Sequence, residues 1–232
     1  MKLLTSNLFY FISFLYLFFS SITSFSQELL NLQGYDMKPF HFGFTINANF
    51  NSFLLTHSEK YLNNDSIKSI NPLTKPGVGL GMLVNFRLEE YFDVRVLPTV
   101  SFYKRDIEYK FRDSINNQKI ESVNMEIPVQ FKYKSERREN FRMYVIAGAK
   151  YGIDMASKAK VVDDTVKLKT KNQDFSLEWG LGMDFYNPMF KFSPEIKWSQ
   201  GILNVYVKGN SVYSDPLLAL LSTSFIISFH FE

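Results

Sequence analysis

Apolar and polar residues alternate with a period of two along most of the chain from residue 40 onward. The clearest stretch is 40–50, where Phe42 and Phe44 flank Gly43 and the alternation continues without a slip. A period of two is typical of a β-strand with one apolar face. About nine to eleven residues cross a bilayer as a strand tilted by roughly 45°. The stretch therefore has the length of a membrane-spanning strand.

The same alternation recurs in later segments of the chain. The predicted strands are 40–50, 77–87, 92–103, 123–133, 141–153, 174–186, 190–199 and 217–231. The long connections, which follow every second strand, are 51–75, 104–121, 154–172 and 201–216. Two of them can also extend the strands: 104–121 as a prolonged hairpin with Asn116 and Asn117 at its tip, and 154–172 through its flanks. Long outer loops that alternate with short periplasmic turns are typical of outer-membrane barrels. The sequence therefore predicts an all-β fold, an eight-stranded antiparallel transmembrane β-barrel, with both chain ends on the periplasmic side.

A soluble β-sandwich and a lipocalin-like barrel are the alternative folds. Their outward faces should be polar, whereas here one face of every predicted strand is apolar. The other face carries charged residues and glycines, which would make a poor soluble core. Aromatic residues make up 17% of the chain, with 24 Phe and 13 Tyr, which suits the aromatic girdles of a membrane barrel. We therefore favour the outer-membrane barrel.

The first 26 residues have the layout of a secretory signal peptide. Lys2 is followed by an apolar run over 8–19 and then by small residues that include Ser24 and Ser26. We predict cleavage after Ser26, a periplasmic leader at 27–39 and a barrel domain at 40–232. An uncleaved membrane anchor is the alternative, but the apolar run is shorter than the roughly 20 residues that a helical span needs.

The inward faces of the predicted strands carry ionisable residues of both signs. An eight-stranded barrel has an interior just wide enough for side chains to fill, and an unpaired buried charge is costly. We therefore predict a plug of ion pairs without conduction, with a narrow ion path or gate as the alternative. The predicted lumen charge network contains Arg87, Arg95, Glu126, Arg142, Lys150, Glu178, Glu195 and Lys197, and the inward set also includes Asp93, Lys132 and Asp184. Inward glycines at 77, 79, 81, 148, 152, 180 and 182 make room for large neighbours or permit curvature.

The chain offers little for catalysis or metal binding. His41 and His230 begin and end the barrel, so we expect a shared polar cluster at the periplasmic end; a two-histidine metal site would lack a third ligand. His57 has Ser52 and Ser58 near it, but in a predicted loop with no catalytic signature. There is no Cys, and the net charge of +3 is too small to indicate a nucleic-acid binder. We expect no enzyme activity, no metal and no cofactor.

Six blocks together resemble the PorT family of outer-membrane barrels. They are KPFHFGFT (38–45), PGVGLG (76–81), YFDVRVLP (91–98), EIPVQFKY (126–133), FKFSPEIK (190–197) and SFHFE (228–232). Their order and spacing carry the resemblance, which spans roughly positions 30–232. It implies a role in the type IX (Por) secretion system, which exports proteins across the outer membrane and supports gliding in some members. It implies no catalytic residues.

Strand count and resemblance together predict an accessory or assembly component of secretion, because eight strands enclose too narrow a lumen to pass a folded protein. The expected partners are outer-membrane lipid and other secretion-system proteins, with no nucleic acid and no small-molecule substrate. The rival hypothesis is a general outer-membrane barrel of the OmpA or OmpX type, which serves adhesion or envelope stability.

Overall fold

The computed structural model describes residues 30–58, 67–111, 115–155, 169–207 and 216–232. The predicted signal peptide lies outside the described residues. A short 3-10 helix, η1 (Tyr35–Met37), precedes the first strand, and no helix of the described residues is long and apolar enough to cross a membrane. Ten strands form one antiparallel sheet: β1 (Phe40–His57), β2 (Ile67–Leu73), β3 (Lys75–Arg87), β4 (Phe92–Val96), β5 (Thr99–Phe111), β6 (Ile115–Lys134), β7 (Phe141–Asp154), β9 (Gln173–Tyr186), β10 (Lys191–Gly201) and β12 (Leu217–Phe231).

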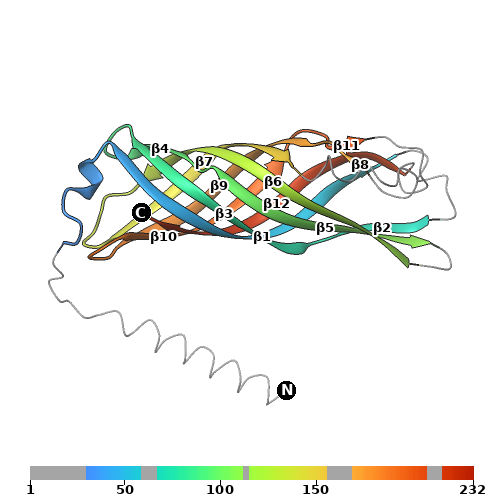
Figure 1. The fold of residues 1–232 in the computed structure, drawn as a ribbon, viewed down its shortest axis with the longest axis horizontal. Helices are drawn as coiled ribbons and strands as arrows, with labels where there is room; N and C mark the ends of the chain where they lie inside the picture. Colours follow the sequence, from blue (N-terminus) through green and yellow to red (C-terminus); the bar gives the residue numbers. More distant parts are fainter. Residues whose placement is uncertain (1–29, 59–66, 112–114, 156–168, 208–215) are drawn as a thin grey trace, which may run out of the picture. The chain divides into compact units, whose positions relative to one another are not determined.

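The sheet closes on itself as a barrel (Figure 1). Its strand order is β1-β12-β10-β9-β7-β6-β4-β3, and β1 also pairs with β3. Thr74 separates β2 from β3, and Leu97 and Pro98 separate β4 from β5, so each of these pairs is one pass of the wall. The ring therefore has eight passes, and the predicted eight-stranded antiparallel barrel is confirmed. A separate two-stranded sheet joins β8 (Lys169–Thr170) to β11 (Tyr206–Val207).

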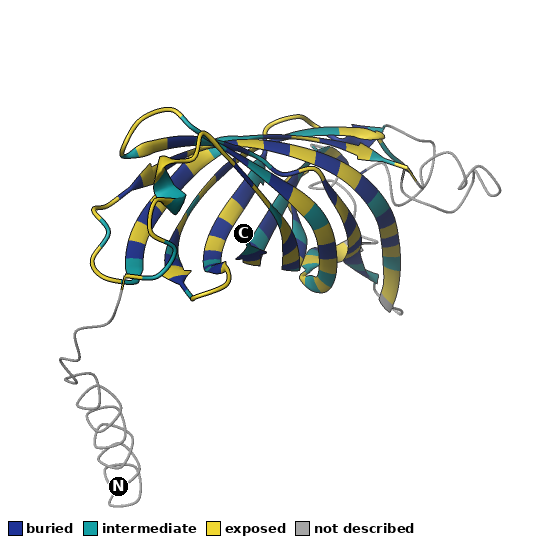
Figure 2. Ribbon diagram, turned by 60° about the vertical axis from the view of Figure 1, so that its left-hand side comes forward, coloured by how far each residue is buried: buried dark blue, intermediate teal, exposed yellow. Residues whose placement is uncertain are grey.

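The two faces of the wall have opposite polarity over the central part of the barrel. Phe44, Leu80, Val129 and Trp179 point outward and are 54%, 58%, 41% and 50% exposed. The residues between them along each strand are buried, which gives the alternating bands in Figure 2. A wide apolar surface of this kind would be unstable in water but suits hydrocarbon. The predicted assignment of faces is therefore confirmed.

The barrel has two distinct ends. Short turns at 88–91, 135–140 and 187–190 lie at one end, together with η1 and the end of β12, and we call this the short-turn end. We call the opposite end the long-loop end. Outward aromatic pairs surround the short-turn end, with ring centroids 5.0–6.1 Å apart: Phe40–Phe86, Phe92–Tyr133, Phe141–Phe185 and Phe190–Phe231. Such a girdle marks the boundary between hydrocarbon and water.

Several strands extend into the predicted long connections, and at 104–121 the expected prolongation of the hairpin is confirmed. β1 continues to His57, and β5 and β6 continue through most of the predicted loop 104–121. Asn116 and Asn117 were predicted at its tip, but they pair with Tyr109 and Glu108 inside the β5–β6 ladder. The predicted loops 51–75, 154–172 and 201–216 likewise contain parts of β1, β2, β8 and β11.

The alternation does not give the length of these extensions, because the polarity of the two faces inverts there. Lys104 and Glu121 point outward with side chains 65% and 67% exposed, and they lie 3.8 Å apart. Ile107 and Tyr109 are fully buried on the inside. The inner surface of the extension is an apolar cluster, which consists of Phe53, Ile70, Ile107, Tyr109, Ile120, Val205, Tyr206, Leu217 and Leu220. The long-loop end is therefore built like a soluble protein, with an apolar core inside and charges outside.

Candidate functional site: the charged lumen and its two ends

Glu195 on β10 is the centre of the lumen network. Arg95 Nη1 donates to its Oε2 at 2.9 Å, and both side chains are fully buried. The Tyr144 hydroxyl donates to the same oxygen at 3.0 Å, and His230 Nε2 lies 3.4 Å from it. Lys197 Nζ lies 3.8 Å from the other oxygen. One carboxylate therefore joins four strands, which rigidifies the interior of the barrel.

A second buried ion pair lies beside this centre. Lys132 Nζ is 2.9 and 2.8 Å from the two carboxylate oxygens of Asp184, and Ser193 donates to Asp184 at 2.6 Å. Lys132 Nζ also lies 3.7 Å from the ring centroid of Tyr144. The charge of the lysine is thus balanced by a carboxylate and an aromatic face in a site from which water is excluded.

A third group continues the network toward the long-loop end. Lys150 Nζ lies 3.0 Å from Glu126 Oε1 and 3.5 Å from Glu178 Oε1. The Tyr103 hydroxyl donates to Glu126 at 2.6 Å, and Gln130 donates to Glu178 at 2.8 Å. Strands β5, β6, β7 and β9 each contribute to this group. These contacts fill the cross-section of the barrel with paired charges.

A glycine makes room for a large side chain of the network. Gly182 lies directly opposite Tyr144 in the β7–β9 ladder. A Cβ at this position would lie 2.4 Å from the Tyr144 ring, closer than real contacts allow. The predicted role of inward glycines as space for large neighbours is therefore confirmed at Gly182.

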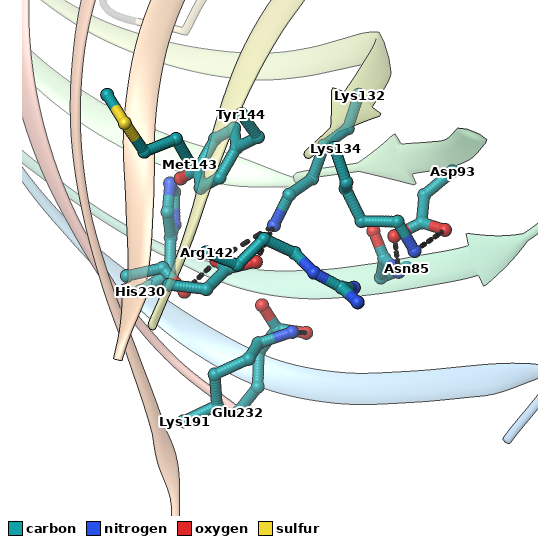
Figure 3. A network of polar contacts seen from close by, with 12 residues as sticks. Asn85, Asp93, Lys132, Lys134, Arg142, Met143, Tyr144, Lys191, His230 and Glu232 are labelled. Carbon is teal, nitrogen blue, oxygen red and sulfur yellow. Dashed lines mark hydrogen bonds and ion pairs between the residues drawn. The ribbon is translucent and has the colours of Figure 1, made fainter. Parts of the chain in front are cut away.

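The lumen stays charged up to the short-turn end, as Figure 3 shows. Lys134 Nζ lies 2.6 Å from Asp93, and Asn85 donates to the same carboxylate at 2.9 Å. Lys191 Nζ lies 2.9 Å from Glu232 Oε2, and these two side chains are almost fully buried. The final residue of the chain is thus part of the lumen network.

The leader covers this end. The Tyr186 hydroxyl donates to Asp36 at 2.8 Å, and Arg142 and Arg137 lie 3.4 and 3.6 Å from the Asp36 carboxylate. The backbone N–H of Asn31 donates to Asn140 Oδ1 at 2.8 Å. The described part of the predicted leader therefore folds onto the barrel.

The opposite end is filled by the apolar cluster. A small hollow adjoins this cluster, and Phe53 lines it together with Arg105, Ser122, Asn124 and Ser222. The Arg105 guanidinium lies 4.9 Å from the Phe53 ring centroid. The described residues thus close the lumen with packed side chains at both ends.

Most residues of the predicted charge network lie inside the barrel. Arg95, Glu126, Arg142, Lys150, Glu178, Glu195 and Lys197 are all buried. Arg87 corrects the prediction, because it is half-buried at the end of β3 and its Nε donates to the carbonyl of Glu89 in the following turn. The alternation predicts the inward residues of β3 correctly as far as Asn85, whereas Arg87 lies at the rim of the barrel.

The two predicted histidines belong to different groups of contacts. His41 Nε2 lies 2.7 Å from the Tyr35 carbonyl oxygen, whereas His230 contacts Glu195 deeper in the lumen. In the β1–β12 ladder Thr45, not His41, lies opposite His230. This corrects the expectation of a shared cluster: four residues of strand separate the two levels.

Several contributors were not in the predicted network. Tyr144, Lys134 and Lys191 lie on strands at inward positions, so the alternation that identified Arg142 and Lys197 could have found them. Asp36 could not have been found, because the leader has no period that indicates which side chains face the barrel.

The described residues contain no group of three or more His, Cys, Asp or Glu side chains arranged to hold a metal ion. His57 is exposed at the end of β1, and Glu59, which follows it closely, lies outside the described residues. The contacts described above are ion pairs and hydrogen bonds between side chains that fill the lumen.

The sequence and the structure were compared with those of known proteins. No curated protein matched the sequence. Among solved structures, OprG from Pseudomonas aeruginosa shares 14% identity at a TM-score of 0.43, over 82% of this chain and 92% of that chain. Neisserial surface protein A shares 9% identity at a TM-score of 0.41, over 83% of this chain and 98% of that chain. Ail, the attachment invasion locus protein of Yersinia pestis, shares 12% identity at a TM-score of 0.36, over 84% of this chain and 99% of that chain.

A family model provides the assignment. The model described as "Outer membrane protein beta-barrel domain" matches residues 25–207, which is most of the chain. The match begins before the first strand and extends through β11. The chain therefore belongs to the outer membrane protein beta-barrel domain family, and the protein is a β-barrel of the outer membrane.

Proposed function

We propose that the protein is a closed, non-enzymatic barrel that acts as an accessory component of protein secretion, with its short-turn end facing the periplasm. The observation that carries the closed state is the filled lumen, in which Arg95, Lys132, Glu178 and Glu195 are fully buried and paired. A folded protein could not pass through such an interior. Cargo would have to cross elsewhere, so the barrel would assist a conduit rather than form one.

The secretion role itself is supported by the sequence blocks that resemble the PorT family. Several of these blocks lie at structural features described above. KPFHFGFT joins the leader to β1, and SFHFE ends at Glu232, which forms an ion pair with Lys191. The apolar outer face of the barrel would contact outer-membrane lipid, and its two ends would be available to bind other secretion-system proteins. The proposal includes neither a nucleic acid nor a small-molecule substrate.

The purified protein should give no stable open channel in planar lipid bilayers. Buried ion pairs fill the lumen, and breaking them would leave unpaired buried charges. Conductance should therefore stay at the baseline of a protein-free membrane across the voltage range in which a wider porin conducts. A large, steady conductance would contradict the closed state.

Deletion of the gene should reduce the amount of secreted protein outside the cell while the outer membrane stays intact. Quantitative proteomics of the culture supernatant would measure the loss, with restoration by the intact gene as control. Unchanged secretion together with altered adhesion would support the rival, a barrel for adhesion or envelope stability. The rival is favoured by the charged outer faces of β5 and β6 at the long-loop end, where Lys104 and Glu121 are exposed.

A further inference from the structure

We infer that the short-turn end is a docking site for a peptide that presents an aromatic residue followed by an acidic one, and that the leader occupies this site until such a partner displaces it. The mouth site, as we call it, consists of Arg137, Arg142, Tyr186, His41 and Lys191. The inference deepens the proposed accessory role and rests on it only for the existence of a periplasmic partner. Binding at the mouth site is independent of whether the lumen conducts.

The acidic half of the site is an arginine pair. Asp36 accepts a hydrogen bond from the Tyr186 hydroxyl at 2.8 Å, but it lies 3.4 Å from Arg142 Nη1 and 3.6 Å from Arg137 Nη1. Arg142 is buried, and its Nε and Nη1 have no hydrogen-bond partner. Arg137 donates to the carbonyl oxygens of Glu139 and Asn31 and to Asn140 Oδ1, so Arg142 is the guanidinium that the Asp36 carboxylate leaves unsatisfied. An incoming carboxylate that bound an arginine in bidentate geometry would make shorter, stronger contacts.

The aromatic half of the site is formed by His41 and Lys191. The Tyr35 ring stacks on the His41 ring with centroids 4.3 Å apart and an angle of 26° between the planes. Lys191 Nζ lies 5.2 Å from the Tyr35 centroid. Tyr35 thus supplies an aromatic ring directly before Asp36 in the chain. An aromatic residue followed by an acidic one is therefore the pair that this surface contacts in the folded protein.

The leader is held by contacts that another peptide could replace. No residue of η1 is buried, and in the described chain residues 31–39 belong to no strand ladder. Leu32 has φ 50°, a left-handed backbone conformation that is unfavourable for a residue with a side chain. Release of the leader would relieve this strain without uncovering an apolar core. Its binding therefore depends on polar and ring contacts of the type that a partner could supply.

Tethering explains why the site is occupied in the absence of a partner. A short linked segment has an effective concentration of roughly millimolar, so even weak binding keeps it in place. A partner peptide must exceed this competition, either by better contacts to Arg142 or by additional contacts outside the mouth. Weakening the leader should therefore uncover the site for a peptide added in solution.

The experiment uses the full chain in lipid nanodiscs and a fluorescent peptide with the sequence of residues 31–39. A barrel with Tyr35→Ala and Asp36→Asn should bind this peptide at least tenfold more tightly than the unaltered barrel does, as measured by fluorescence anisotropy. An unlabelled peptide with Tyr-Asp in unrelated Ser-Gly flanks should compete. A labelled peptide with Asn in place of Asp should bind at least tenfold more weakly.

Further variants locate the binding. Arg142→Gln in the altered barrel should abolish peptide binding; Arg137→Gln, in the turn outside the wall, tests the same contact if the first variant does not fold. Arg87→Gln removes a rim charge outside the mouth site and should leave binding unchanged. Absence of binding by the folded altered barrel, or equal binding of the Asp and Asn peptides, would overturn the inference. Neither result would bear on the conductance test of the closed state.

Discussion

Replacing Glu195 with Gln should lower the free energy of unfolding by about 3–5 kcal/mol, the cost typical of breaking a buried ion pair by removing one partner. Glu195 neutralises Arg95 at 2.9 Å and Lys197 at 3.8 Å, and all three residues are buried. A glutamine would preserve the shape of the side chain but leave these cations with less compensating charge. Equilibrium unfolding by denaturant in lipid vesicles would measure the change.

The matched control is Glu121→Gln at the long-loop end. Glu121 pairs with Lys104 at 3.8 Å, but both side chains are about two-thirds exposed, at 67% and 65%. Exposed ion pairs contribute only about 0–1 kcal/mol because water screens them. Equal losses for the two variants would show that the lumen is as well hydrated as the surface, and would contradict a closed interior.

Replacing Leu181 with Arg should destabilise the folded barrel in lipid by about 2–4 kcal/mol, the cost of an arginine on the lipid face near the bilayer midplane. Leu181 is 55% exposed and lies in the middle of the outward residues of β9. The variant should fold less efficiently into vesicles, as measured by the loss of the folded, heat-modifiable band on a gel. The extent of folding at several lipid thicknesses would show whether depth determines the effect.

Met189→Arg provides the control for depth. Met189 lies in the turn between β9 and β10 and is 90% exposed. The cost of arginine falls to about 0–1 kcal/mol near the membrane boundary, where its charge reaches water. If Leu181→Arg proves as harmless as Met189→Arg, hydrocarbon does not contact the middle of β9.

The central part of the barrel could be predicted because two different solvents act on the two faces of each strand. Where hydrocarbon lies outside and paired charges lie inside, the alternation is strict, and residues such as Trp179 and Glu178 are assigned by position alone. Closure into a ring follows from the rule that open sheet edges do not occur in lipid. The number of passes, and the face of the wall on which a residue of the central barrel lies, could therefore be predicted without knowledge of tertiary contacts.

The ion-pair partners could not be predicted from the same alternation. Arg95 and Glu195 are 100 residues apart, and their strands, β4 and β10, are not neighbours in the sheet. Which inward residues meet across the lumen depends on the tilt and stagger of the strands, and these properties emerge only when the ring closes. The alternation identifies the members of the network, but closure decides how they pair.

The length of the strand extensions and the contacts of the leader could not be predicted for a different reason. At Phe53 and Ile107 the inward face becomes apolar, so the continuing strand no longer shows polar residues inside and apolar residues outside. The leader binds through single side chains, such as Asp36 on Arg142, and single contacts leave no periodic signal in a sequence. Both features depend on what lies opposite them in the folded molecule.

The change of polarity along β5 also fixes the height at which the barrel can sit in the bilayer. Moving the molecule inward along the membrane normal would bring Lys104 into hydrocarbon, and moving it outward would place Val100 in water. A shift of β5 by one residue against its neighbours would place Ile107 in water and Ser101 in lipid at the same time. The strand is thereby held against sliding in both directions. Residues at the long-loop end therefore set the depth of the mouth site relative to the bilayer surface nearest to it.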